Sequence, residues 1–396
     1  MIEIKASVTI PKIISLYADL YTAETDGGRG IDLKLPLSLT NNHFGVLFSL
    51  LQFVSCWIRS PLSGNLILPV LTDEEAAEYL KNEFVYPTVV LAWEKEILNL
   101  AGANIRTVLK KPSQIYYQEL DFFKNKEHHS IPVFCFDHDQ SKRGKSRVFY
   151  DLNNRLMRES NMEFTLHPAF EKLSNQFNKA VFKSSVKNEL TTFYGIIHEL
   201  FSNTDEHAKT NEKGFNLYPN IRALYIKFHR TSLERYLDIY KEFPGLVKFF
   251  SSGFQTGEQN QLYLVEISVL DSGPGLYKRF TGNSDFETSI GNEIDIIKQC
   301  LYIHKTSATE INKSNKGYGL DRILKLLDGK GFLRIKTGRA DVFRDMKNTR
   351  YVAHENPSDI QLNDWINNSN NSYTVNQAVE GALISILYPL TYVPYE

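Results

Sequence analysis

Apolar residues recur every three or four positions across residues 193–208, the spacing that gathers them on one face of a helix. Glu199 and Asn203 are four residues apart, so both project from one stripe of that helix. A carboxylate and an amide on one stripe can hold a water and a hard cation, which suits metal-assisted attack of water on a phosphate. The solvated face of an ordinary helix carries the same residue types, so this pattern alone leaves both interpretations open.

The apolar pattern also predicts the other elements in the second half of the chain. Residues 262–270 form a near-continuous apolar run, which predicts a central strand buried on both faces. Residues 356–377 are rich in Asn and Ser and predict an irregular segment. The other expected elements are strands over residues 221–229, 332–337 and 382–387, and helices over residues 231–250 (broken at Pro244), 287–303 and 320–327.

Strand and helix patterns alternate in the first half of the chain, which predicts an α/β module. The clearest helix start is Thr72, because this capping residue is followed three positions later by the carboxylate of Glu75. The other expected elements here are strands over residues 31–37, 65–71 and 131–136, and a helix over residues 43–59 capped by Asn42.

These elements divide the chain into three expected parts. Residues 1–160 form the α/β module, residues 161–185 form a helical linker, and residues 186–396 form a second domain. A length of 396 residues and a hydrophobic fraction of 42% are enough for two such domains with buried cores. The expected fold class is therefore α/β (α+β).

The overall charge and the cysteines restrict the expected partners and compartment. The formal net charge is −1, so no strong field favours nucleic acid or an anionic membrane. The three cysteines are scattered, which indicates a reducing compartment and gives no metal-ligand spacing. The sequence has no apolar run long enough for a membrane span and no signal-peptide pattern at its start. We therefore expect a cytoplasmic protein without a membrane partner.

Two glycine-containing segments follow the expected elements. Residues 271–275 have the sequence Asp-Ser-Gly-Pro-Gly and come directly after the central strand. Residues 317–320 have the sequence Gly-Tyr-Gly-Leu and open an apolar helix. Glycines at a helix start let backbone N–H groups approach a phosphate closely. Taken singly, each segment also fits a plain turn or a glycine-rich helix entry without a ligand.

The three segments, Glu-xxx-Asn at residues 199–203, Asp-x-Gly-x-Gly at 271–275 and Gly-x-Gly-Leu at 317–320, occur in an order that resembles the GHKL ATPases. This superfamily includes gyrase B subunits, MutL, histidine kinases and large heat-shock chaperones. The resemblance covers residues 186–394. It implies a Bergerat fold, a mixed sheet with helices on one face, that binds ATP with Mg²⁺. The α/β module before it is similar to the STAS-like modules found beside some bacterial GHKL domains.

The resemblance also implies roles for individual residues. Asn203 would ligate the Mg²⁺, and Glu199 would orient or deprotonate the attacking water. Asp271 would accept from the exocyclic amine of adenine. Backbone approach would be allowed by Gly273 and Gly275 at the base and by Gly317 and Gly319 at the phosphates, before Leu320. Residues 304–316 resemble an ATP lid. The candidates for phosphate contacts in it are Lys305, Thr306, Ser307, Lys313 and Lys316, with Lys305 and Lys316 as the preferred pair.

The sequence departs from the family pattern at two places. Family members usually carry Thr or Ser near the adenine in the last strand, whereas this chain has Gly381 and Ala382, with Ser385 further on. A histidine kinase also needs a dimerisation hairpin with a phospho-accepting histidine, and residues 160–190 contain only His167.

The expected function is therefore a slow ATPase that uses ATP-driven lid closure as a switch for a partner or a homodimer. The alternatives are a protein kinase of the anti-sigma or histidine-kinase type, and a nucleotide-sensing module of a multi-gene system such as antiviral defence. A plain α/β scaffold without a nucleotide is the remaining interpretation.

Overall fold

The computed structural model describes residues 1–25, 30–125, 127, 129–138, 144–176, 179–257, 260–283, 288–302 and 319–391. In this part of the chain the strands form two sheets, which confirms the α/β (α+β) class. A small parallel sheet has the order β1 (Ile2–Glu3), β2 (Ile31–Lys34), β3 (Ser63–Ile67) and β4 (Ile97–Leu98).

The large sheet has seven strands, and every neighbouring pair is antiparallel. Its order is β10 (Asn363–Asp364), β9 (Ala340–Asp345), β8 (Phe332–Gly338), β11 (Val379–Pro389), β7 (Gln261–Asp271), β6 (Arg222–Ser232) and β5 (Ser130–Cys135). The central strand expected over residues 262–270 is confirmed as β7, which is buried on both faces. The expected mixed sheet is wrong, because no two neighbouring strands of this sheet run parallel to each other.

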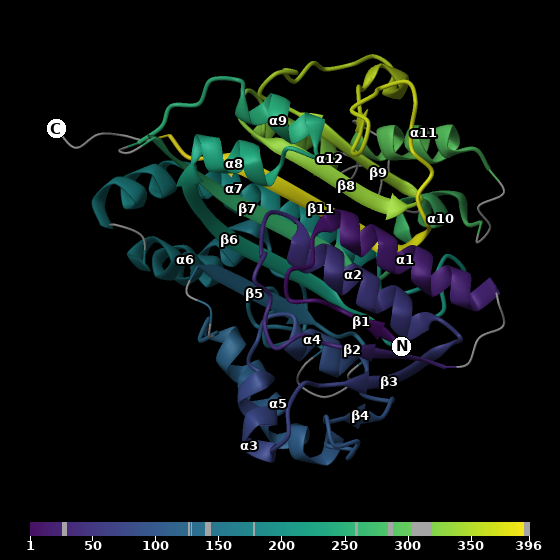
Figure 1. The fold of residues 1–396 in the computed structure, drawn as a ribbon. Coiled ribbons are helices and arrows are strands. Elements are labelled where there is room, and N and C mark those ends of the chain that lie inside the picture. Colours follow the sequence, from purple (N-terminus) through teal and green to yellow (C-terminus); the bar gives the residue numbers. More distant parts are fainter. Residues whose placement is uncertain are drawn as a thin grey trace.

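Helices pack on both faces of the large sheet, whereas helices on one face were expected (Figure 1). The helices of the described residues are α1 (Ile10–Thr25), α2 (Val46–Arg59), α3 (Asp73–Tyr79), α4 (Val85–Leu91), α5 (Arg106–Asp121), α6 (Glu159–Gln176), α7 (Lys179–His207), α8 (Leu233–Ile239), α9 (Pro244–Phe250), α10 (Gly275–Thr281), α11 (Ile290–Leu301) and α12 (Gly319–Leu326). One face carries α6, α7, α11 and α12, and the other carries α2, α8 and α9.

Helix α2 explains why the second face is covered. It packs on β7 and β11 of the large sheet and also on β3 of the parallel sheet, so it lies between the two sheets (Figure 1). Every residue of α2 except Arg59 is buried. A helix that is apolar all round is stable only when it is surrounded in this way. The first part of the chain is therefore packed directly against the large sheet.

Two elements cross the expected domain boundaries. Strand β5, which falls within residues 1–160, pairs with β6 and forms an edge of the large sheet. Helix α7 is continuous from Lys179 to His207 and spans the expected boundary after residue 185. The amphipathic segment 193–208 is thus the C-terminal half of a longer helix.

Local signals located several elements well and others less well. The capping box is confirmed, because Thr72 Oγ1 accepts from Glu75 N and the Glu75 side chain accepts from Thr72 N. The helix expected from residue 43 begins at Val46, after Gly45 with φ of 75°. Strand β6 extends to Ser232, so the helix expected over 231–250 is two short helices. Among the described residues, no helix combines the length and apolar character needed to cross a membrane.

Candidate functional site

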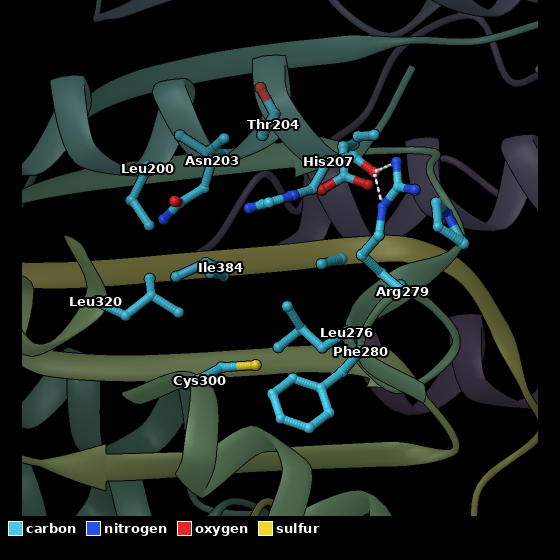
Figure 2. A pocket seen from close by; sticks show the side chains of 16 residues that line it. Leu200, Asn203, Thr204, His207, Leu276, Arg279, Phe280, Cys300, Leu320 and Ile384 are labelled. Carbon is cyan, nitrogen blue, oxygen red and sulfur yellow. Dashed lines mark hydrogen bonds between the residues drawn. The ribbon is translucent and has the colours of Figure 1, made fainter. Parts of the chain in front are cut away.

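One cavity lies between α7, α10, α12 and the large sheet, and we call it the α7–α12 cavity (Figure 2). Asn203 from α7, Asp271 from the end of β7, Gly275 from the start of α10 and Leu320 from the start of α12 all line it. The cavity encloses about 960 Å³, including space open to solvent. The fold therefore brings residues of all three sequence motifs to one cavity.

The walls of the α7–α12 cavity are largely apolar. Most of their apolar side chains come from α7, β7, α10, α12 and β11, and these include Leu200, Val269, Leu276, Phe280, Leu320, Ala382 and Ile384. Polar groups are fewer and lie mainly along α7 and at the Asp271 loop. An apolar wall with a few placed polar groups is the usual lining of a site for a flat organic ligand.

Asp271 is the buried carboxylate of this cavity. Its residue is only 9% exposed, and the backbone N–H of Gly273 donates to its Oδ1 at 2.8 Å. Burial raises the pKa of Asp271 to about 6, against the lowering effect of backbone donors and of the positive charges of Arg222 and Arg59. The group is therefore mainly ionised at neutral pH and can act as a hydrogen-bond acceptor inside an apolar wall.

The glycines after Asp271 are required by the packing of the chain itself. A Cβ atom on Gly273 would lie 2.7 Å from Cα of Ala208, at the end of α7. Gly275 has a φ of +79°, and its Cβ would lie 2.8 Å from Oγ1 of Thr337. Since a side chain fits at neither position, the loop can lie directly against α7 and β8.

Glu199 lies one turn before Asn203 and is not part of the cavity lining. Its carboxylate accepts from the guanidinium of Arg322 in α12 at 2.8 Å. The same guanidinium donates to both carboxylate oxygens of Glu159, the first residue of α6, at 2.7 Å and 2.8 Å. The carboxylate predicted to activate water is therefore held in an ion pair that joins α6, α7 and α12.

The same cluster contains the one group of candidate metal ligands found among the described residues. Ligand atoms of Glu159, His198 and Glu199 lie within 4.8 Å of one another. The Arg322 guanidinium already donates to both carboxylates, so a protein cation supplies the positive charge here. We therefore assign no metal to this cluster.

His207 is a cavity residue whose role the sequence did not assign. It lines the α7–α12 cavity and lies four residues after Asn203, so it continues the same stripe of α7. Of its neighbours, Asp205 pairs instead with Arg222 at 3.3 Å, and Glu206 is exposed. The four-residue spacing from Asn203 is the signal that could have selected His207 from this acidic run.

Arg279 of α10 also lines the cavity, and no sequence pattern selected it. Its Nε and Nη2 donate to the carbonyl oxygen of His207 at 2.8 Å and 2.5 Å (Figure 2). Nη2 also donates to Thr210 Oγ1 at 3.0 Å. These bonds satisfy carbonyl groups at the end of α7 that lack partners within the helix. Arg279 thereby fixes α10 to the end of the helix that carries Asn203.

The last strand supplies no hydroxyl to the described lining. Ala382 and Ile384 of β11 face the cavity, whereas Ser385 Oγ accepts from Ser268 Oγ at 2.8 Å on the opposite face of the sheet. Thr337 of β8 lies behind the Asp271 loop and accepts from the backbone N–H of Leu276 at 3.1 Å. At the cavity, β11 therefore has Ala382 and Ile384 where family members usually have a Thr or Ser near the adenine.

Some predicted site residues lie outside the described residues. These residues are Lys305, Thr306, Ser307, Lys313, Lys316 and Gly317. Gly319 is described and is the first residue of α12, next to Leu320 in the cavity wall.

Comparison of the chain with protein-family models, with curated proteins and with solved structures gave no match. The assignment of a function therefore depends on the geometry of the cavity and on the order of the three motifs.

Proposed function

We propose that this chain binds ATP with Mg²⁺ in the α7–α12 cavity and hydrolyses it slowly, so that bound nucleotide acts as a switch for a protein partner or a second copy. The observation that carries the proposal is the convergence of Asn203, Asp271 and Leu320 on one cavity. These residues belong to separate motifs on separate elements. Three unrelated segments would have no reason to meet around one apolar cavity with a buried carboxylate.

The adenine base would occupy the apolar part of the cavity, beside Asp271. An ionised carboxylate accepts hydrogen bonds and cannot donate them, so it suits the exocyclic amine of adenine and opposes the carbonyl oxygen of guanine at the same place. Rejecting a ligand that leaves a buried polar group unpaired is an effective source of specificity. The apolar walls provide the contact area for the ring.

The phosphates would extend from the base towards Asn203 and the start of α12. The Asn203 side chain makes no hydrogen bond with the described residues, so its amide oxygen is available to a cation. Bound Mg²⁺ supplies positive charge that offsets the charge on the phosphate oxygens. Backbone N–H groups in the first turn of α12, from Gly319 onwards, suit an anion.

Slow hydrolysis is proposed because Glu199 is engaged by Arg322. A carboxylate that accepts from a guanidinium has fewer lone pairs free to hold and activate a water. Glu199 would act on water only after α12 moves with Arg322, which ties the rate of hydrolysis to the arrangement of α12 and α7. Such control is typical of nucleotide-dependent switches.

The proposal is tested by measuring ATP and GTP binding with and without Mg²⁺, together with phosphate release. Wild type should bind ATP at least about tenfold more tightly than GTP. Asp271→Asn should lose this preference, Asn203→Ala should lose the effect of Mg²⁺, and Glu199→Ala should bind ATP without turnover. The matched control is Glu206→Ala, on the exposed face of the same helix. Absence of ATP binding by folded wild type would end the proposal.

A protein kinase of the anti-sigma or histidine-kinase type is the second candidate. The engaged state of Glu199 favours it, because an enzyme that transfers phosphate to a protein must keep the γ-phosphate away from activated water. Incubating this chain with radiolabelled ATP and with the proteins encoded by neighbouring genes distinguishes the two functions. A labelled partner protein, with little free phosphate, would place the kinase first.

A further inference from the structure

A second cavity is lined in part by other residues of α12, namely Asp321, Leu324 and Lys325. It encloses about 530 Å³, including space open to solvent, and we call it the Arg344 cavity. Its polar lining comes from the end of α11, from α12, from β9 and from the segment after β9; it consists of Tyr302, Asp321, Lys325, Arg344, Tyr351 and His354. None of these residues lines the α7–α12 cavity.

Arg344 is the unusual member of this lining. The residue is 3% exposed, so its guanidinium is almost fully removed from water. Nε donates to the sulfur of Met346 at 3.0 Å, Nη1 donates to the carbonyl of Gln361 at 2.9 Å, and Nη2 donates to the carbonyl of Arg350 at 3.3 Å. A guanidinium has five N–H donors, so two donors of Arg344 remain available to a ligand after these three bonds.

No carboxylate of the described residues forms an ion pair with Arg344. The nearest acid in the cavity lining is Asp321, whose Oδ2 pairs with Lys325 at 2.7 Å and whose Oδ1 accepts from Tyr351 at 2.9 Å. Burial lowers the pKa of Arg344, and no neighbouring acid opposes that effect. A buried charge without a counter-charge is destabilising, so this arrangement favours a bound anion.

Two further side chains in the lining also suit an anion. Nε2 of His354 is buried and has no hydrogen-bond partner in the described ranges of the chain. The Lys325 side chain is 45% exposed at the rim, and its single charge is shared with Asp321. Arg344 thus adds one uncompensated positive charge to a cavity that also offers an imidazole and an ammonium group.

We propose that the Arg344 cavity binds a small anion with a phosphate group, held by Arg344 and His354 with Lys325 at the rim. A guanidinium matches two phosphate oxygens at once, and an imidazole N–H can donate to a third. The occupant would contact α12 through Lys325. The proposal does not depend on what the α7–α12 cavity binds.

The test measures binding of inorganic phosphate to the full chain by calorimetry at constant ionic strength, with acetate as the comparison anion. Wild type should bind phosphate more tightly than acetate. Arg344→Met should weaken phosphate binding at least about tenfold, as expected when a charged hydrogen-bond partner is lost. Because Arg344→Met removes a buried group, the double variant Lys325→Gln/His354→Gln provides a second test at less buried positions, and it should also weaken binding.

Glu206→Ala, at an exposed position of α7 outside both cavities, is the control variant and should leave the phosphate affinity unchanged. The proposal is overturned if phosphate does not bind to wild type in the millimolar range. It is also overturned if Arg344→Met and the double variant, both folded, bind phosphate as tightly as wild type.

Discussion

The guanidinium of Arg322 donates to the carboxylate of Glu199 at 2.8 Å and to both oxygens of Glu159, at 2.7 Å and 2.8 Å. Arg322 is three residues beyond Gly319, at the helix start that is proposed to face phosphate. One side chain therefore links the proposed phosphate end of the site to the carboxylate predicted to activate water. The Arg322 side chain is 37% exposed, so solvent screens the pair and its contribution to stability is small.

Releasing Glu199 should accelerate ATP turnover. The double variant Arg322→Gln/Glu159→Gln removes the guanidinium and also avoids leaving two facing carboxylates. We expect phosphate release to rise roughly three- to tenfold, a small part of what a free general base can provide. Addition of Glu199→Ala to this variant should abolish the gain. Arg350→Gln, which breaks an exposed ion pair with Asp328, is the control. A fall in turnover would instead give Arg322 a direct role in catalysis.

ATP affinity should fall as the pH falls through 6. Asp271 has a pKa raised to about 6 by burial, and only its ionised form accepts from the adenine amine. Below that pH, affinity should decrease by up to about tenfold per pH unit, the limit for one coupled proton. Titrations between pH 5 and 8 on wild type and Asp271→Asn measure this, because titration of the ligand is common to both. A pH profile unchanged by Asp271→Asn would contradict the assignment.

The same raised pKa makes a prediction about stability without nucleotide. The folded state binds this proton more readily than the unfolded state, since the folded pKa of about 6 exceeds the ordinary aspartate pKa of 3.8. The contribution of Asp271 to the free energy of unfolding should therefore increase as the pH falls from above 6 towards 4. The difference between the free energies of unfolding of wild type and Asp271→Asn, measured with urea at each pH, isolates that contribution. A difference that grows with rising pH in favour of wild type would refute it.

The first part of the chain should influence nucleotide binding through Arg59. This last residue of α2 donates to the Pro219 carbonyl at 2.8 Å, to Glu380 at 2.6 Å and to Ser272 Oγ at 3.2 Å. Ser272 lies next to Asp271, so loss of the guanidinium loosens the loop that carries the proposed adenine acceptor. Arg59→Met should weaken ATP binding roughly fivefold or more, within the usual range of coupling between sites.

Glu380→Gln is the matched variant for Arg59→Met. It removes only the charge of the ion pair and leaves the bonds from Arg59 to Pro219 and Ser272. Its effect on ATP affinity should therefore be smaller than that of Arg59→Met. Equal effects of the two variants would show that the ion pair alone positions the loop.

The buried pair of Arg334 and Asp341 should control stability and not nucleotide binding. Both side chains are 1% exposed, and the guanidinium makes two bonds to the carboxylate at 2.9 Å and 2.7 Å. Arg334→Met leaves Asp341 unpaired and should lower the free energy of unfolding by about 3–5 kcal/mol. Arg334→Met/Asp341→Leu should recover much of that loss. Because the pair lies on the face covered by α2, ATP affinity of the folded variants should stay unchanged.

Much of the candidate site could be predicted because its signals are local. Apolar spacing located the second half of α7 and the strand β7, since helices and strands repeat at fixed and different periods. The same spacing places Asn203 and Glu199 on one stripe. The capping box at Thr72 involves residues three positions apart, so it was also readable from the sequence.

Other features could not be predicted, because they depend on residues far apart in the chain. Nothing near Glu199 indicates that Arg322 will engage it, and nothing near β5 indicates that it will pair with β6. The apolar residues of α2 indicated burial but not its position between two sheets. His207 carried a usable spacing signal, whereas Arg279 acquires its place only when α10 packs on the end of α7.

The sequence by itself determined the central strand β7, the second half of α7, the end of that strand at Asp271, and the order of the three motifs. These properties follow from periodicity, turn chemistry and hydrogen bonds between near neighbours. Only the tertiary structure decided that Asn203, Asp271 and Leu320 line one cavity, that Glu199 is held by Arg322, and that Arg344 is buried without an acid partner among the described residues. Those relationships are set by long-range packing of whole elements, which no short stretch of sequence encodes.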